Sequence, residues 1–304
     1  QDSMAAAISK QALNGATLDV VWNLTLAANI ISANVQYGQI EKIKEVAGVQ
    51  EVILENRYEP CVVKQEETAD PNMATSDKMI GSSAAWAAGY TGAGSRIAII
   101  DTGADVDHPS LDPDALKYAL QGSNATIMTA ADLTDEVLNQ LNAYTRKAGL
   151  TAADFYVNEK IPFGFNYVDA DTHDNDTQGD HGSHVTGIAA GNRFVKDEAG
   201  NYVAALDSVM TQGVAPDAQI LTMKVFGKRG GAYDSDYMVA IEDAMVLGAD
   251  AANLSLGGSF PGYSEYTEEK YRHILDEIVG SGMVVTISAG NSGSWFDQTA
   301  FGLP

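Results

Sequence analysis

Short apolar runs that alternate with helical patterns limit the fold of this chain more than any other feature. Five such runs occur, at residues 96–100, 163–168, 220–225, 251–256 and 283–288. Helical spacing of apolar residues falls between several of them, at 183–190, 236–247 and 267–279. Buried strands alternating with helices are typical of a parallel sheet covered on both faces. The sequence therefore predicts an α/β domain, with ligands bound beyond the carboxyl ends of the strands.

A smaller α+β unit precedes this domain. The patterns of residues 1–58 predict a helix, two strands, a second helix and a third strand, at 3–13, 17–26, 30–36, 39–46 and 49–54. That order fits a ferredoxin-like unit without its first strand. Residues 59–77 are polar and acidic with two prolines, which predicts an exposed linker. Residues 78–304 hold the parallel sheet. Within them a first helix is predicted at 82–88, and an acidic stretch rich in loops and helices at 112–162.

Charge and cysteine content exclude several classes of function. The chain has 18 basic and 41 acidic residues, a net charge of −23, which argues against nucleic acid or an anionic membrane as a partner. Cys61 is the single cysteine, so neither an internal disulfide nor a thiolate metal cluster is expected. No apolar run reaches 18 residues, so no membrane span is predicted. The start at Gln1 suggests an N-terminus processed from further upstream.

The first chemical motif, Asp101-Thr102-Gly103, directly follows an apolar run. A hydrophobic pair before Asp-Thr-Gly also opens aspartic proteases, in which two carboxylates share a proton. That interpretation requires a second Asp-Thr-Gly or Asp-Ser-Gly, and the sequence contains none. The sequence therefore disfavours the aspartic-protease interpretation of Asp101, which would also leave the downstream histidine motif unexplained.

The second motif, His181-Gly-Ser-His184-Val-Thr-Gly187, begins a helical segment rich in small residues. One alternative is a metal site, because the histidines are one turn apart and acidic residues precede them, namely Asp171, Asp174, Asp176 and Asp180. Zinc requires three or four placed ligands, and no glutamate follows His181 as in helical zinc proteases. The metal interpretation of His181 is therefore disfavoured, and His184 is expected to be a structural helix residue.

The third motif, Ser288-Ala-Gly-Asn291-Ser292, follows the last apolar run. A side-chain amide at such a strand end can donate a hydrogen bond to a developing oxyanion. Asn291 alone would be interpreted as a polar turn residue.

Together the three motifs resemble the subtilase family of serine proteases, in which the chain order is Asp, His, Ser. Further segments fit that pattern, at 89–94, 213–216 and 253–258. Residues 1–58 are similar to the inhibitory prodomain of the family, and residues 160–169 with the insert before them are similar to the cell-envelope proteinases of Gram-positive bacteria, the lactocepin type. The resemblance implies a subtilisin-like fold.

The resemblance also implies residue roles. Asp101 would orient His181, His181 would act as general base and then acid, and Asn291 would complete the oxyanion hole. An extended peptide substrate would be bound as an added strand between two edges, Ser255-Leu256-Gly257 on one side and Gly231 with Tyr233 on the other. The chemistry needs no cofactor. Many members bind calcium through an aspartate whose position is Ser110 here, so calcium is left open, with the acidic stretch 169–180 as an alternative site.

The nucleophile itself is missing, because no Gly-Thr-Ser occurs in the sequence. We expect the serine beyond residue 304 or on another chain, most simply a second polypeptide that also covers the apolar strand at 283–288. The predicted protein is a secreted or cell-envelope serine endopeptidase in zymogen form, acting on proteins or peptides. The alternatives are a catalytically inactive binding protein of the same fold and a zinc hydrolase.

Overall fold

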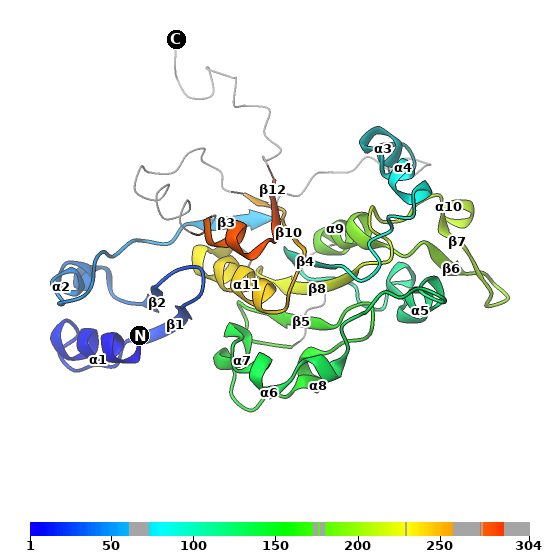
Figure 1. The fold of residues 1–304 in the computed structure, drawn as a ribbon. Coiled ribbons are helices and arrows are strands. Elements are labelled where there is room, and N and C mark those ends of the chain that lie inside the picture. The colour runs from blue at the N-terminus through cyan, green and yellow to red at the C-terminus, as the bar shows by residue number, and fades with distance from the viewer. Residues whose placement is uncertain are drawn as a thin grey trace, which may run out of the picture.

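The computed structural model describes residues 1–60, 73–172, 176, 180–228, 230–257, 274 and 276–288. A parallel sheet with helices forms the centre of the molecule, and a smaller N-terminal unit lies at one end (Figure 1). The predicted α/β architecture is confirmed. Asn291, Cys61 and most of the predicted linker lie outside the described residues.

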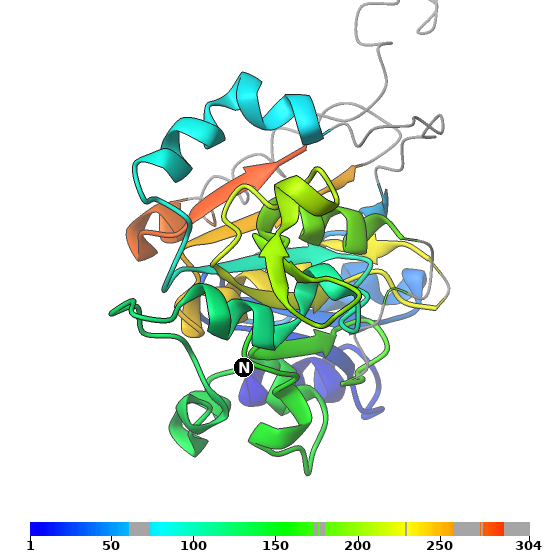
Figure 2. The same cartoon turned by 90° about the vertical axis from the view of Figure 1, so that its right-hand side faces the viewer.

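The central sheet contains the five predicted strands, all parallel. Their order across the sheet is β12-β10-β4-β8-β5 (Figure 2), with bounds Val284–Ile287, Ala251–Leu254, Arg96–Asp101, Gln219–Lys224 and Phe163–Asn166. Strand β4 is in the middle and pairs with β8 from Arg96–Gln219 to Asp101–Lys224. Residue 101 therefore leaves the sheet at the centre of its carboxyl edge, where α/β folds bind ligands.

Alternation along β4 divides the core into two layers. Ala98 and Ile100 pack in the cluster that contains the buried face of helix α11, Asp234–Val246. Ile97 and Ile99 pack in a second cluster with residues of helix α9, His181–Ala190. Successive side chains of a strand point to opposite faces, so the two helices cover opposite sides of the sheet.

Short elements surround this sheet. The helices are α3 Met73–Ile80, α4 Ser82–Ala87, η2 Pro109–Leu111, α5 Pro113–Ala119, η3 Ala130–Asp132, α6 Asp135–Leu138, α7 Asn142–Arg146, α8 Ala152–Phe155 and α10 Ala205–Ser208. Strands β6 Phe194–Lys196 and β7 Tyr202–Ala204 form an antiparallel pair. Helix α3 begins inside the segment predicted as linker. Residues 276–281 are helical and overlap the end of the helix predicted at 267–279.

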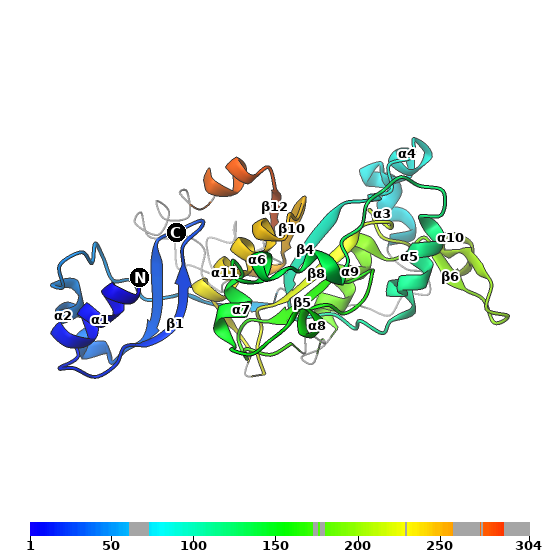
Figure 3. The ribbon, with the colours of Figure 1, turned by 60° about the horizontal axis from the view of Figure 1, so that its bottom comes forward.

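The N-terminal unit packs against helix α11 through one of its strands (Figure 3). It consists of α1 Asp2–Gln11, β1 Asp19–Leu24, β2 Ile30–Asn34, η1 Tyr37–Gln39 and α2 Ile40–Lys44. The pairing of β1 with β2 shifts register between Val20 and Trp22. This irregularity lets Val20 pack within the unit's own apolar cluster, whereas Trp22 and Leu24 enter the core of the main domain.

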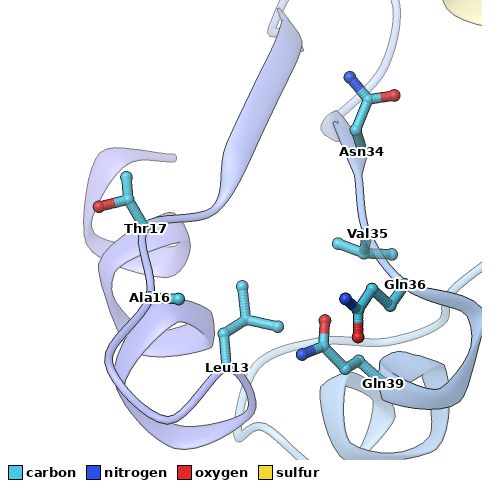
Figure 4. A pocket seen from close by; sticks show the side chains of 7 residues that line it. All are labelled: Leu13, Ala16, Thr17, Asn34, Val35, Gln36 and Gln39. Atoms are coloured by element: carbon cyan, nitrogen blue, oxygen red, sulfur yellow. The ribbon is translucent and has the colours of Figure 1, made fainter.

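A shallow hollow in the N-terminal unit lies between the loop after α1 and the end of β2 (Figure 4). Its lining is Leu13, Ala16, Thr17, Asn34, Val35, Gln36 and Gln39. Every lining residue belongs to the N-terminal unit. The hollow is therefore separate from the residues with chemical motifs.

The strand predicted at 49–54 is wrong. Residues 49–56 form no strand. Among the described residues, the sheet of the N-terminal unit contains β1 and β2 alone, so 49–54 is not part of it. The chain instead forms strand β3, Arg57–Pro60, between β9, Ala232–Tyr233, and β11, Leu256–Gly257. Strand β3 thus spans the predicted boundary between N-terminal unit and linker, because it pairs with edges of the main domain.

A buried lysine at the start of β5 makes stability depend on pH. Lys160 is fully buried, and its Nζ donates to the carbonyls of Pro216 at 2.9 Å and Ala218 at 2.8 Å. Burial lowers the pKa of Lys160 to about 7. The unfolded chain, with a lysine pKa near 10.5, binds more protons between these values, so the free energy of unfolding should rise with pH from about 7 to 10.5.

Replacing this lysine with methionine tests that expectation. We expect the wild-type free energy of unfolding, minus that of Lys160→Met, to be roughly 2–4 kcal/mol larger at pH 10 than at pH 7. Urea denaturation of the full-length protein at both pH values measures it. The exposed Lys10→Met is the control and should give no such change. A pH-independent difference for Lys160→Met would contradict a lowered pKa.

Candidate active site

The Asp101 and His181 side chains meet at the carboxyl edge of the sheet. Asp101 is the last residue of β4, and His181 is the first residue of α9, which packs on β4. His181 Nδ1 lies 2.7 Å from Asp101 Oδ1. Asp101 is fully buried, and the His181 side chain is 15% exposed. The structure therefore brings together two of the three residues that the sequence singled out for catalysis.

Hydrogen bonds hold this carboxylate and imidazole in one orientation. The backbone N–H of Thr102 donates to Asp101 Oδ1 at 2.7 Å and so fixes the carboxylate oxygen that also contacts the imidazole of His181. With Nδ1 directed at the carboxylate, Nε2 points away from Asp101 on the other side of the ring. An imidazole oriented this way by an acidic partner can take a proton from a nucleophile and return it to a leaving group.

The start of α9 fits closely against the Asp-Thr-Gly turn. Gly182 N–H donates to Thr102 Oγ1 at 2.9 Å, and Lys224 Nζ donates to the Thr102 carbonyl. A Cβ on Gly182 would stand 2.0 Å from the Gly103 carbonyl oxygen, so no other residue fits without a shift of backbone. The small residue thus allows the helix to approach near enough for the 2.7 Å bond between His181 and Asp101.

The predicted peptide-binding edges lie on both sides of strand β3. Leu256 and Gly257 pair antiparallel with Pro60 and Glu59. On the other side Tyr233 pairs with Arg57, next to Gly231, where a Cβ would stand 2.3 Å from Arg57 Nε. Ser255 lies just before β11 and accepts a bond from Asn253 Nδ2 at 2.9 Å. The Tyr233 side chain is 46% exposed, so only its backbone takes part in this pairing.

The segment that leads to the third motif is tied to the same edge. Ser288 N–H donates to the Leu254 carbonyl at 3.0 Å, and Ser288 Oγ donates to the Leu256 carbonyl at 2.9 Å. Asn291 itself lies outside the described residues, so its predicted position at the oxyanion hole stays a prediction.

The described acidic residues near His181, namely Asp171, Asp176 and Asp180, do not converge on a metal ion, and Asp174 lies outside the described residues. No group of three histidine, cysteine or acidic side chains that could hold a metal occurs in the described parts of the chain. Asp176 Oδ2 instead accepts the Ser183 N–H at 3.1 Å. At the position expected for a calcium ligand, Ser110 Oγ is 2.7 Å from His108 Nδ1. A serine bonded to a histidine does not supply the carboxylate of the usual calcium site of the predicted family.

Several residues of the site were missed in the sequence. Thr102 receives the Gly182 bond, and its place inside the Asp-Thr-Gly motif was the available signal. Tyr58 is 5% exposed in β3, and Asp234 at the start of α11 accepts its hydroxyl. No local pattern indicated this contact, because its two residues are 176 positions apart.

None of the helices in the described ranges has the length and apolar character needed to span a bilayer.

Comparison with known proteins points to one family. The sequence model described as "Subtilase family" matches residues 92–301. The PI-type proteinase of Lactococcus lactis subsp. cremoris is 32% identical over 274 residues, which cover 88% of this chain and 12% of that protein. The minor extracellular protease Vpr of Bacillus subtilis is 30% identical over 79% of this chain and 23% of its own length. The C5a peptidase of Streptococcus pyogenes is 29% identical over 68% of this chain and 16% of its own length.

Proposed function

The chain belongs to the subtilase family, and we propose that it is the part of an extracellular or cell-envelope serine endopeptidase that activates the nucleophile. The observation that carries this proposal is the 2.7 Å bond between His181 Nδ1 and the buried Asp101, at the carboxyl edge of the central sheet. The chain spans 12% of the lactococcal proteinase and 23% of the Bacillus protease that it matches. Their names as proteinases and as an extracellular protease support the activity and the location.

In the proposed mechanism His181 Nε2 accepts the proton of a serine hydroxyl as the serine attacks the substrate carbonyl. Asp101 stabilises the resulting imidazolium, and His181 then gives the proton to the leaving amine. Asn291 donates to the oxyanion of the tetrahedral intermediate. The substrate is bound as a strand between Ser255-Leu256-Gly257 and the segment from Gly231 to Tyr233. Every one of these steps uses chemistry that the chain's own residues supply, apart from the serine.

We assign the nucleophilic serine to polypeptide outside these 304 residues. The sequence has no Gly-Thr-Ser. Strand β12 is at the end of the described sheet and exposes Val284 by 61% and Ile287 by 60%. Apolar side chains on an open sheet edge favour cover by further structure. Further polypeptide, continuous with this chain or separate from it, would cover β12 and supply the serine.

The N-terminal unit is proposed to inhibit the enzyme, with β3 occupying the cleft of the substrate. The unit is attached to helix α11 by buried contacts. Trp22 Nε1 donates to Asp236 Oδ1 at 2.9 Å, and Glu242 Oε1 accepts the N–H groups of Leu26 and Ala27 at 2.9 and 2.7 Å. A buried carboxylate that loses its donors is costly, so these bonds make departure of the unit slow.

A substitution confined to the N-terminal unit tests this inhibition. Trp22→Phe removes the donor to Asp236 and leaves the protease part unchanged, so the unit should be released about tenfold faster or more. The lag before full-length protein hydrolyses a fluorogenic peptide measures the release. Tyr37→Phe, at a site 77% exposed on the same unit, is the control and should keep the wild-type lag. An unchanged lag in Trp22→Phe would contradict the proposed contact.

A fluorophosphonate probe tests the proposed function. It should label one serine of the full-length protein, outside residues 1–304, and labelling should require His181. Complete absence of labelling would favour the alternative of an inactive protein with a subtilase fold. Activity that chelators abolish and serine reagents spare would favour a zinc hydrolase.

A further inference from the structure

Strand β3 buries one side chain in the main domain and leaves its neighbours at the surface. Tyr58 is 5% exposed, whereas Arg57 and Glu59 are about half exposed and form an ion pair at 2.9 Å. This alternation is that of a strand, and β3 pairs with β11 on one side and β9 on the other. A peptide bound in the same place would direct the side chain at the position of Tyr58 into the pocket that holds it.

The pocket of Tyr58 combines an apolar wall with a carboxylate. The ring of Tyr58 meets the ring of Tyr237 edge to face, with centroids 5.5 Å apart. Ala232 and Leu256 are buried in the same apolar cluster. At the end of the ring, Tyr58 Oη donates to Asp234 Oδ1 at 2.8 Å. The wall suits any aromatic ring, and the carboxylate suits the hydroxyl of tyrosine.

The residues that form this pocket stay behind when the N-terminal unit leaves. Asp234 is the first residue of α11, a position where the helix dipole favours negative charge. The Tyr237 hydroxyl donates to Asp234 Oδ1 at 3.1 Å and holds that oxygen toward the pocket. Asn56 donates to the other oxygen at 2.6 Å and departs with Tyr58. The acceptor is therefore in place for a substrate hydroxyl.

The pairing of the strands shows on which side of the cleaved bond this pocket lies. Leu254 pairs with Ile100, so Ser255 and Asp101 leave the sheet side by side. Pro60 is opposite Leu256, and antiparallel pairing continued by one position would place the next substrate residue opposite Ser255, toward the Asp101–His181 pair. The pocket of Tyr58 thus receives a residue on the N-terminal side of the cleaved bond, separated from it by at least two residues.

We propose that Asp234 makes the protease selective for tyrosine over phenylalanine at the substrate position that corresponds to Tyr58. A site that hydrogen-bonds a substrate hydroxyl discriminates against the analogue that lacks it, because the site's polar group then loses that bond. Asp234 is partly exposed, so water compensates in part and about tenfold discrimination is expected. This inference rests on the proposed endopeptidase function.

Fluorogenic peptides with the sequence of residues 57–61 before the leaving group, and with tyrosine, phenylalanine or arginine at the second position, test the proposal. For the full-length protease, kcat/KM should be about tenfold higher for tyrosine than for phenylalanine. Asp234→Ala should bring this ratio close to one. Asp207→Ala, an exposed acidic residue of α10, is the control and should keep the wild-type ratio.

Equal rates for tyrosine and phenylalanine in the wild type, a preference for arginine, or a tyrosine preference that survives in Asp234→Ala would each overturn the inference. Fluorophosphonate labelling of each variant shows that its catalytic centre is intact, independently of the peptide used. A labelled enzyme without tyrosine preference contradicts this inference alone. If the protein shows neither labelling by the probe nor hydrolysis of any peptide, the proposed function is overturned, and this inference with it.

Discussion

Replacing His181 with alanine is expected to lower kcat of the full-length protease by about 10⁵-fold, the scale on which triads lose activity without their base. His181 is held by the fully buried Asp101 through a 2.7 Å bond and is the proposed acceptor of the serine proton. KM should change little, because the imidazole makes its main contribution in the transition state. Steady-state hydrolysis of a fluorogenic peptide measures both constants.

The control for this substitution is His184→Ala. His184 is exposed one turn further along α9, and it belongs to the alternative in which the two histidines bind a metal. The proposed mechanism expects near wild-type activity for His184→Ala. Comparable losses for both variants, together with inhibition by chelators, would contradict a base role for His181 alone.

The second large effect is expected for Gly182→Ala, which should abolish most activity and lower the free energy of unfolding by about 3 kcal/mol. The added Cβ would stand 2.0 Å from the Gly103 carbonyl oxygen and 2.9 Å from Thr102 Oγ1. Helix α9 must therefore move away from the turn after β4, and His181 moves with it. Urea denaturation and peptide hydrolysis measure the two effects.

Gly187→Ala on the same helix is the matched control. A Cβ there has no atom within 4 Å, so alanine should be neutral or stabilise the helix by up to about 1 kcal/mol. Wild-type stability and activity in Gly182→Ala would contradict the close approach of α9 to the Asp-Thr-Gly turn. His181→Ala, by contrast, should lose activity and keep its stability, which separates loss of chemistry from loss of fold.

The central sheet could be predicted because β4, β5 and β8 are largely buried on both faces. Such strands are continuous apolar runs, and the chain shows them at each of the five places where the structure has a strand. The contact of Asp101 with His181 was expected from the resemblance to the subtilase family, and the geometry of the sheet is consistent with it. A residue at the carboxyl end of a central strand and one at the start of a covering helix lie at the same edge of a parallel sheet.

The position of strand β3 could not be predicted in the same way. Arg57-Tyr-Glu-Pro60 has no apolar pattern, and its strand exists because backbone groups of β9 and β11 are open on both sides of it. The predicted strand at 49–54 has the better alternation, yet among the described residues it has no neighbour with which to pair. Helix α3 was missed because its sequence, Met-Ala-Thr-Ser-Asp-Lys-Met-Ile, follows directly on a polar stretch with two prolines.

The sequence by itself determined the parallel sheet, its approximate strand bounds and the place of Asp101 at the end of one strand, because the hydrophobic period and the residues that follow an apolar run are local properties of the chain. The order of the strands across the sheet is not a local property. Only the tertiary structure decided that residues 57–60 form a strand between β9 and β11 and that Tyr58 meets Asp234 there. Those contacts join residues 176 positions apart through backbone pairing and a single hydrogen bond, and neither leaves a periodic trace in the sequence.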